Sequence, residues 1–485
     1  MKAKRLDNYG KINRDKVLSF SWDNQNYFGY EGDSIASALL ANNIQIIGRS
    51  FKYHRPRGIM SCGVEESGGL ITVGDNDRRD PNVRATTQEL YQGLIATGQN
   101  AFPNVNFDIG EINNYLSRFF AAGFYYKTFM GIPPFEWGSG TSIWMFFEKI
   151  IRKAAGMGKL SRLPDPDSYE HAHDFCDLLI VGSGPAGIEA AKEAADKKLD
   201  VILVEQDSLI GGEQLAEVEF DDSLIYRELE GLGVRIMKRT TAFGLYDNNV
   251  VGLLERVTDH LPQSKDNIPR QRFWTIRAKH LIVGSGSLER HIAFNNNDVP
   301  GVMTVNAAKH YLNRYGVLTG KNIVITTNND SVYDTAYLLF KAGANVTVLD
   351  ARIDVDLDNK IKENIQIRYG KVPYSINGSR KIKSLEIADA THNPYKKTDS
   401  IECDQVLMSG GWSPAVHLLS HRGVRPTWNN ENLCFLPSDT KENITMIGSA
   451  RGIWNKEKCM ESGVAGALDA MNKLGLSKTN YFFPK

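Results

Sequence analysis

The stretch from Asp177 to Glu205, DLLIVGSGPAGIEAAKEAADKKLDVILVE, constrains the fold of this chain more than any other. It runs as a buried strand, a glycine-rich turn, a helix and a second strand. Gly182, Gly184 and Gly187 complete a GxGxxG pattern, and the second strand ends on an acidic residue, Glu205. A glycine turn in this full strand-turn-helix-strand-acid context predicts a Rossmann-type nucleotide-binding unit.

Each residue of the pattern has a separate task. Gly182 permits the tight turn, Gly184 lets the backbone approach a pyrophosphate, and Gly187 allows close helix–strand packing. The helix N-terminus offers unpaired N–H groups to the phosphate. Glu205 is expected to bind the adenosine ribose hydroxyls and to repel a 2′-phosphate, which favours FAD or NAD over NADP. The alternative is a degenerate Rossmann fold that keeps its glycines only for packing.

Further positions are expected to line the same site: Pro185, Ala186, Gln206, Gly212, Ala242, Gly284, Ser285, Gly286 and Gly448. The loop alone does not separate FAD from NAD, because both present the same ADP half. In FAD enzymes with two dinucleotide domains, a late strand usually ends in Gly-Asp, and its acid contacts the flavin ribityl chain. The matching strand here, NITMIGSARG, has Ser449 after Gly448, which favours NAD.

A second strand-helix-strand unit spans residues 321–350 and departs from the pattern. Its turn, Thr327 to Ser331 (TNNDS), has no glycine, although Asp350 still ends the second strand. A Cβ at the close-approach position obstructs a pyrophosphate, so we expect this unit to be structural or to bind something different. LIVGSGS (281–287) and VLMSGGWSP (406–414) are expected to be the two crossings that join such paired domains.

At 485 residues the chain is too long for one hydrophobic core, so several domains are expected. The predicted fold class is α/β: an N-terminal β-rich, ferredoxin-like domain without a cluster, then a paired Rossmann-like fold of the FAD/NAD type. In the first domain we expect a hairpin and a short helix from Asp33-Ser34 to Asn42-Asn43. The predicted division is residues 1–95, a connecting segment 96–173, a first Rossmann domain 174–300 plus 403–475, and an inserted degenerate second domain 301–402.

Aromatic residues crowd positions 115–150, where prolines and glycines exclude one regular helix. Packing within its own chain is one interpretation; a surface for a partner subunit is another, because aromatics concentrate in interface cores. Membrane insertion is the third. Residues 162–175, polar and with two prolines, are expected to form a linker, in which His171 and His173 are solvated instead of binding a metal.

Charge and cysteine content limit the function classes. The 57 basic and 57 acidic side chains balance, which favours neither nucleic acid nor an anionic membrane surface. No apolar run is long enough for a membrane span, and none follows the basic N-terminus as in a signal peptide. The five cysteines are an odd number without a CxxC pair, which fits a reducing cytosol and a cytoplasmic protein.

The chain resembles the N-terminal half of the α subunit of heterotetrameric sarcosine oxidase, over essentially its whole length, and the related large subunit of N-methylglutamate dehydrogenase. The strings that carry this resemblance are GDSIASALLANN, GRSFKYHRPRGIM, PNVRATTQELY, AGFYYKTFM, PDPDSYEHAHDFCDLLIVGSGPAG, TTNNDS and SGGWSPAVHL.

The resemblance implies an oxidoreductase that oxidises a secondary amine such as sarcosine and contains FAD, covalent FMN and NAD. In that family the β subunit carries FAD and the amine-oxidising site, FMN lies near the α/β contact, and the α subunit holds NAD. Here Gly182, Gly184, Gly187 and Glu205 would therefore hold NAD, with FAD as the other choice. The implied partners are a β-type flavoprotein subunit and small subunits; no catalytic residue is assigned.

The first module also resembles a plant-type [2Fe–2S] domain. Aligning VRAT (83–86) with VRAC places the ligand positions at Ser61, Glu66, Gly69 and Thr86, and none is a thiolate. Cys62 is the only cysteine nearby, and a cluster needs four ligands, so the domain is expected to keep the fold without the cluster. The basic run His54, Arg55 and Arg57 is expected to be a solvated surface, or else to contact a cofactor phosphate or a partner subunit.

The family's α subunit continues into a folate-binding half, whereas this chain stops at NYFFPK. Folate binding is therefore not expected here; that half is either truncated or on a separate polypeptide. The leading prediction is a dinucleotide-binding α-type subunit of a heteromeric flavin-dependent secondary-amine oxidase or dehydrogenase, with amine oxidation on a partner. The alternatives are a stand-alone FAD/NAD(P)H-dependent oxidoreductase and a structural subunit with a permanently bound nucleotide.

Overall fold

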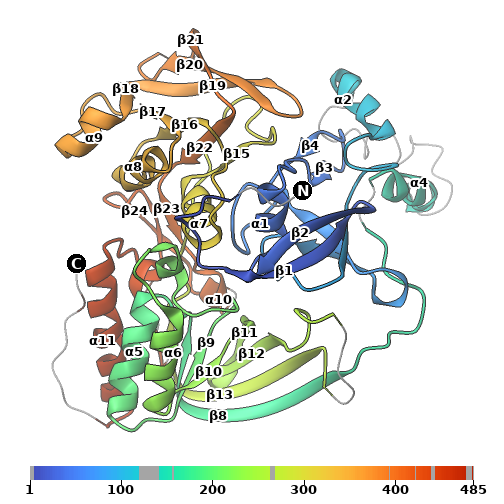
Figure 1. Cartoon of the computed structure of the whole chain (residues 1–485). Helices are drawn as coiled ribbons and strands as arrows, with labels where there is room; N and C mark the ends of the chain where they lie inside the picture. Colours follow the sequence, from blue (N-terminus) through green and yellow to red (C-terminus); the bar gives the residue numbers. More distant parts are fainter. Residues whose placement is uncertain are drawn as a thin grey trace. The chain divides into compact units, whose positions relative to one another are not determined.

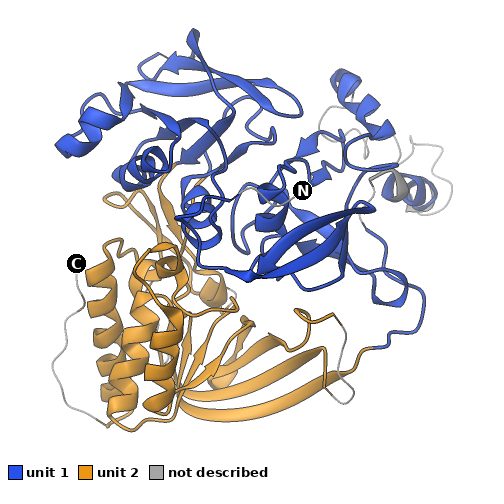
Figure 2. Cartoon of the chain, viewed as in Figure 1, with its two compact units in different colours: residues 1–166, 291–409 blue, residues 167–290, 410–485 orange. Residues whose placement is uncertain are grey.

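A computed structural model describes residues 5–119, 141–155, 158–262, 268–392, 394–420, 422–438, 443–476 and 483. The chain divides into two compact units, residues 1–166 with 291–409 (unit 1) and residues 167–290 with 410–485 (unit 2), coloured blue and orange in Figure 2. It passes between them at 166–167, 290–291 and 409–410, and the last two passages lie beside or within the two predicted crossing segments. Most of the aromatic-rich segment, residues 120–140, lies outside the described residues.

Unit 2 is built on one mixed sheet (Figure 1). Its strands are β8 (Tyr169–Val181), β9 (Val201–Val204), β10 (Arg235–Met237), β11 (Thr240–Tyr246), β12 (Val250–Arg256), β13 (Gln271–Val283) and β26 (Ile444–Met446). The order β10-β9-β8-β13 is parallel, and β26 extends it beside the end of β13. The first half of β13 pairs antiparallel with β12, which pairs with β11. LLIV and VILV are apolar throughout because parallel strands are covered on both faces.

The long helices of unit 2 are α5 (Pro185–Asp196), α6 (Asp222–Gly231) and α11 (Lys456–Lys473). Helices α5 and α11 lie side by side (Figure 1). Their contact is close because a Cβ on Gly463 would overlap the carbonyl oxygen of Ala186. The shorter elements are η4 (Gly212–Ala216), η5 (Asp247–Asn249), β14 (Ser287–Glu289), β23 (Trp412–Pro414), α10 (His417–Ser420), β24 (Thr427–Asn429), β25 (Cys434–Leu436) and η7 (Gly448–Arg451).

The linker prediction for residues 162–175 is wrong in its second half, because β8 begins at Tyr169. Residues 169–175 pair with residues 271–277 in the first half of β13, and this backbone pairing overrides their polar composition. His171 and His173 therefore lie on a strand, with ring centroids 4.8 Å apart, and His171 Nε2 is 3.1 Å from Thr275 Oγ1. Among the described residues, no three His, Cys, Asp or Glu side chains group as a metal site.

The first module of unit 1 is a five-stranded sheet in the order β2-β1-β7-β5-β6. Its strands are β1 (Asn13–Trp22), β2 (Gln25–Glu31), β5 (Leu70–Val73), β6 (Asp80–Arg84) and β7 (Leu94–Gly98). Helix α1 (Ile35–Ala41) begins after Ser34, which forms a capping box with Ser37, and its C-cap is Asn42. The predicted hairpin and short helix are thus confirmed. Between and after these elements lie β3 (Gly48–Arg49), β4 (Pro56–Arg57), η1 (Asn76–Arg78), η2 (Ile109–Glu111), α2 (Ile112–Tyr115), η3 (Ser117–Phe119) and α4 (Thr141–Ala155).

The rest of unit 1 is a second Rossmann-like domain with a parallel sheet in the order β15-β22-β16-β17-β18. Its elements are β15 (Val302–Thr304), α7 (Val305–Tyr315), β16 (Asn322–Thr327), η6 (Asp330–Val332), α8 (Tyr333–Lys341), β17 (Asn345–Asp350), α9 (Asn359–Asn364), β18 (Gln366–Tyr369) and β22 (Gln405–Ser409), with an antiparallel sheet of β19 (Lys371–Gly378), β20 (Ile382–Asp389) and β21 (Lys397–Glu402). The predicted boundary at 402/403 assigned residues 405–409 to the first Rossmann domain, whereas β22 pairs with β15 and β16 here.

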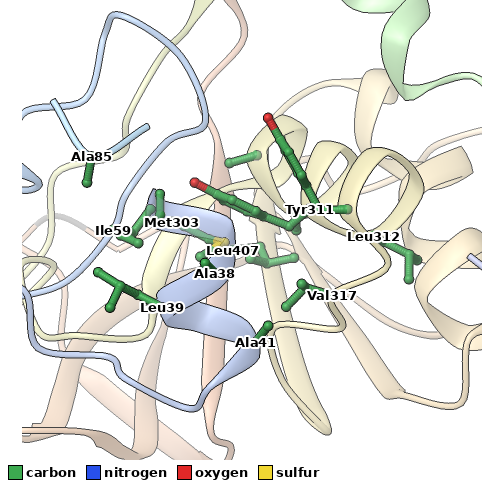
Figure 3. Packing of buried hydrophobic residues seen from close by; sticks show 14 of the residues in the cluster. Ala38, Leu39, Ala41, Ile59, Ala85, Met303, Tyr311, Leu312, Val317 and Leu407 are labelled. Atoms are coloured by element: carbon green, nitrogen blue, oxygen red, sulfur yellow. The ribbon is translucent and has the colours of Figure 1, made fainter. Parts of the chain in front are cut away.

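One hydrophobic core joins the two parts of unit 1 (Figure 3). Helix α1 contributes Ala38, Leu39 and Ala41, and helix α7 contributes Tyr311 and Leu312. The first module and the second Rossmann-like domain therefore fold as one packed body. Within the described ranges, no helix has both the length and the apolar character needed to cross a membrane.

Candidate dinucleotide-binding site

The predicted phosphate loop connects β8 to α5, and its three glycines occupy different surroundings. Gly182 has φ +101°, and a Cβ there would overlap the carbonyl oxygen of Gly284. A Cβ on Gly187 would overlap the carbonyl oxygen of Gly182. At Gly184, by contrast, no heavy atom of the described chain lies within 4 Å of the Cβ position. The fold itself requires the first and third glycines, and the second faces open space.

That open space lies in front of the N-terminus of α5. Gly184 is the extended N-cap residue, no described side chain caps the helix, and Pro185 occupies the first turn. The first N–H groups of an α-helix have no intrahelical partner, and proline is well placed there because it lacks one. An uncapped glycine-rich helix start therefore has the donors and the partial positive charge that a phosphate needs.

Glu205, the residue after β9, is fixed next to the loop. Its side chain is buried, and Oε2 accepts hydrogen bonds from the backbone N–H (3.1 Å) and the hydroxyl (2.5 Å) of Ser183. Oε1 accepts from the N–H of Asp207 at 2.8 Å. Burial raises the pKa of Glu205, and these hydrogen bonds oppose the rise. The acid is thus held at the loop before any ligand arrives.

Ser183 is a site residue that the sequence reasoning did not single out. Its hydroxyl donates to Glu205 and accepts from the N–H of Gly211 at 3.2 Å, so one side chain links the phosphate loop, the acid and the segment before η4. The GxGxxG pattern allows any residue at position 183, so the only feature of the sequence that could have indicated this linking role is the hydroxyl of the serine.

Several of the other predicted positions surround the loop. A Cβ on Gly212 would lie 3.1 Å from Gly184 Cα, and one on Gly448 would lie 2.9 Å from Ala186 Cβ. Gly284 borders Gly182, as described above. Gly448 has φ +62°, and its N–H donates to Ser462 Oγ at 3.1 Å. The end of β26, with Ser449 in place of an acid, therefore lies against the start of α5.

Four positions have looser connections to the loop. Ser285 Oγ donates to the carbonyl of Ala415 at 2.6 Å, and Gly286 (φ +77°) faces open space. Gln206 is exposed, and its carbonyl accepts from Arg256 at 2.8 Å. Ala242 lies on β11 opposite Leu253 of β12. Contact of these residues with a nucleotide remains a prediction.

The glycine-free loop of the second Rossmann-like domain is occupied by its own side chains. Asn329 Nδ2 donates to the carbonyl of Ser409 (3.2 Å), and Asn329 Oδ1 accepts from the N–H of Ser331 (3.1 Å). At the end of β17 the buried Asp350 carboxylate accepts from Tyr333 Oη and Arg352 Nη2, both at 2.7 Å. The acid at the end of β17 is thus bonded within its own domain, as Glu205 is, and the clear difference between the two sites is the loop, which here has no glycine.

The predicted cluster positions of the first module do not fit a [2Fe–2S] cluster. Ser61, Gly69 and the Glu66 side chain converge in the loop between β4 and β5, and Thr86 bonds to the same loop. None of the four supplies a thiolate, and the Glu66 carboxylate fills the centre of the loop. Iron–sulfur clusters are held by cysteine thiolates.

The basic run of the first module is not a solvated surface, and the expectation that it would be is wrong. His54 is buried, with Nδ1 2.6 Å from Asp108 Oδ2. Arg55 and Arg57 both ion-pair with Asp298, Arg55 at 2.7 Å. These side chains hold unit 1 together, because Asp298 lies just before the second Rossmann-like domain.

Two family descriptions match the chain. Residues 15–101 match a 2Fe-2S iron-sulfur cluster binding domain, and residues 176–448 match the pyridine nucleotide-disulphide oxidoreductase description. The second match spans more than half of the 485 residues and contains the phosphate loop, Glu205 and the second Rossmann-like domain. The chain belongs to the pyridine nucleotide-disulphide oxidoreductase family, and the predicted fold class is confirmed.

Two curated relatives show which named proteins the chain is similar to. The chain is 40% identical to "Sarcosine oxidase subunit alpha" of Rhizobium meliloti (strain 1021), over 98% of this chain and 48% of that protein. It is 30% identical to the protein of the same name from Corynebacterium sp. (strain U-96), over 96% of this chain and 45% of that protein. The resemblance found in the sequence is thus confirmed, and the chain spans about half the length of these curated relatives.

A solved structure shares the fold over nearly the whole chain. It is the L-proline dehydrogenase from P.horikoshii, with a TM-score of 0.63 and 17% identity, covering 97% of this chain and 76% of that chain. At this identity the likeness concerns the fold alone.

Proposed function

We propose that this chain is the dinucleotide-binding α-type subunit of a heteromeric flavin-dependent secondary-amine oxidase or dehydrogenase. The observation that carries the proposal is the uncapped start of α5, where Gly184 faces open space and Ser183 holds Glu205 beside it. This arrangement places phosphate donors at the loop and a ribose acceptor, Glu205, at the end of the neighbouring strand β9. The α-subunit names of the similar proteins support the assignment to an enzyme with further subunits.

Within this proposal the bound dinucleotide is NAD, held by the phosphate loop and Glu205. Ser449 supports this choice, because it follows Gly448 where a flavin site of this type has an acid. When bound, a nicotinamide dinucleotide supplies hydride chemistry. Amine oxidation on a β-type flavoprotein partner, FMN at a subunit contact, small subunits and a cytoplasmic location belong to the same proposal and rest on the family resemblance.

The alternative is a stand-alone FAD/NAD(P)H-dependent oxidoreductase, which the family match favours. Four of the five cysteines are unsuited to the disulfide chemistry in the name of that family, and the fifth, Cys62, is partly exposed. Cys176, Cys403, Cys434 and Cys459 are buried and form no disulfide. Burial raises the pKa of Cys176 and Cys403 to about 12, and the thiolate is the reactive form of cysteine.

Purifying the chain, denaturing it and identifying the released nucleotide by absorbance and mass tests the proposal. We expect about one NAD per chain and no flavin, because only the first Rossmann unit has an open phosphate loop. Released FAD would support the alternative.

An activity assay tests the subunit assignment. Amine-dependent dye reduction should require co-expression with a β-like partner, and NADH oxidation by the isolated chain would contradict the subunit assignment.

A further inference from the structure

The loop from Met60 to Gly69 is organised around one carboxylate. Glu66 is 3% exposed, and its Oε2 accepts hydrogen bonds from the N–H groups of Met60 (2.9 Å) and Ser61 (2.8 Å) and from the Ser61 hydroxyl (3.3 Å). Oε1 accepts from the N–H groups of Gly68 (2.6 Å) and Gly69 (3.0 Å). Five donors therefore converge on a single buried anion.

The same carboxylate occupies the place of the missing cluster ligands. A Cβ on Gly69 would lie 2.9 Å from Glu66 Cγ, so the Glu66 side chain fills the space into which a ligand at 69 would project. Thr86 Oγ1, in the turn after β6, donates to the carbonyl of Gly63 at 2.7 Å and closes the loop from its other side. Hydrogen bonds to the sulfurs are part of how a protein holds a cluster, and here the backbone N–H groups of the loop point at carboxylate oxygens.

We propose that the Glu66 carboxylate is an internal replacement for the iron–sulfur cluster, a fixed anion that holds this loop and makes the first module a structural adaptor instead of an electron carrier. Four of the five partners of Glu66 are backbone N–H groups, so an amide in either orientation would direct its NH₂ group at two of them. A carboxylate accepts from all five; burial raises the pKa of Glu66, and the hydrogen bonds oppose the rise.

The outer side of the loop supports the adaptor role. Tyr311 Oη on α7 donates to the carbonyl of Ser61 at 2.8 Å, and the N–H of Thr304 on β15 donates to the carbonyl of Met60 at 2.9 Å. Tyr311 is fully buried in the shared core (Figure 3). The Met60–Ser61 end of the loop is thus bonded to the second Rossmann-like domain of the same unit, whereas Val64 and Ser67 further along it are exposed.

A pair of neutralising substitutions tests the role of the charge. Glu66→Gln keeps the shape but turns an NH₂ group toward two N–H donors, and we expect it to lower the midpoint of thermal unfolding by about 5 °C or more. Glu65→Gln is the matched control, because the Glu65 carboxylate accepts from the N–H of Gly63 at 3.2 Å and does not share the four backbone donors that surround Glu66. Equal midpoints for the two variants would overturn the proposal.

Cluster reconstitution tests the replacement directly and does not depend on Glu66→Gln folding. The full chain is incubated anaerobically with ferrous iron and sulfide, and bound iron, visible absorbance and the reduced electron paramagnetic resonance signal are measured. We expect none of these from the natural chain. We expect about two irons per chain in the variant with Ser61→Cys, Glu66→Cys, Gly69→Cys and Thr86→Cys. A cluster in the natural chain, or a folded four-cysteine variant without one, would refute the replacement.

Discussion

At the scale of single residues, the glycines of the phosphate loop serve two different requirements, folding and nucleotide binding, which the sequence pattern does not distinguish. The pattern assigns three tasks to three glycines, but it does not say which of these glycines the protein needs in order to fold without a nucleotide. Gly182 and Gly187 are required by overlaps with backbone carbonyl groups, whereas Gly184 has open space around its Cβ position. Substitution at these positions should therefore affect stability and binding separately.

The first prediction compares Gly184→Ala with Gly187→Ala. Gly184 has φ −67°, which alanine adopts freely, so the free energy of unfolding should change by less than about 0.5 kcal/mol. Nucleotide affinity should fall at least about tenfold, because the methyl group meets the pyrophosphate. Gly187→Ala should cost about 2–4 kcal/mol, since its Cβ overlaps backbone. Urea denaturation and titration calorimetry distinguish the variants; unchanged affinity in Gly184→Ala would move the site elsewhere.

The second prediction concerns Ser183, whose hydroxyl serves both Glu205 and Gly211. Ser183→Ala removes the hydroxyl hydrogen bond to the buried carboxylate, which should cost about 1–3 kcal/mol of stability and weaken nucleotide binding. Ser208→Ala is a control, because that hydroxyl bonds to Asp207 at 3.1 Å and not to Glu205. Equal dissociation constants for the two variants would show that Ser183 does not position the acid.

At the scale of elements, the alternation of strand and helix patterns predicted both strand-helix-strand units, a glycine turn marked the first of them, and the hairpin with α1 was also predicted. They did not predict that β8 reaches back to Tyr169 and includes His171. Polar residues carry no strand signal there, because the pairing with β13 comes from residues about a hundred positions away. For the same reason, the partners of Arg55 and Arg57 could not be read from the sequence.

The third prediction concerns Asp298, which joins the β3–β4 region to residues 291–301. Asp298→Asn leaves Arg55 and Arg57 without their carboxylate and should cost about 1–3 kcal/mol at pH 7. Asp7→Asn is the control, since Asp7 is fully exposed opposite Arg14. Urea denaturation of the full chain measures both, and equal midpoints would contradict the prediction.

The Asp298 carboxylate also predicts how the stability of the chain depends on pH. Burial alone would raise the pKa of Asp298, but the hydrogen bonds and charges of Arg55 and Arg57 outweigh it and lower the pKa. A depressed carboxyl pKa stabilises the fold above the unfolded value of about 4, and this stability is lost as pH falls through the folded value. Below about pH 4 the stability of Asp298→Asn should therefore fall less steeply than that of the natural chain.

At the scale of the whole molecule, unit 1 combines two parts that the sequence presents as separate domains. The two parts are separated by more than a hundred residues along the chain, so the sequence does not reveal their common core, in which Leu39 packs with Tyr311 and Leu312. The apolar pattern of each element predicts that it is buried, but not against which partner. The predicted boundaries place the two parts in separate domains and say nothing of this shared packing.

The fourth prediction tests whether unit 1 unfolds cooperatively. Leu39→Ala leaves a cavity in the shared core and should cost about 2–5 kcal/mol. Amide hydrogen exchange should then accelerate in both β1 and β16, although only β1 belongs to the first module. Leu160→Ala is a control, because that side chain is 74% exposed. Loss of protection in β1 alone would show that the two parts open independently.

The division of the chain between the units also sets an order of events during synthesis. Every described segment of unit 1 has been synthesised once residue 409 is made, whereas unit 2 still lacks β26, η7 and α11. Gly448 of η7 and Gly463 of α11, which pack against Ala186, belong to those late elements. The phosphate loop is therefore translated early but cannot acquire its packing until about 270 residues later. A ribosome paused after residue 409 has left its exit tunnel, but before α11 has, would display a folded unit 1 and an unfinished phosphate loop.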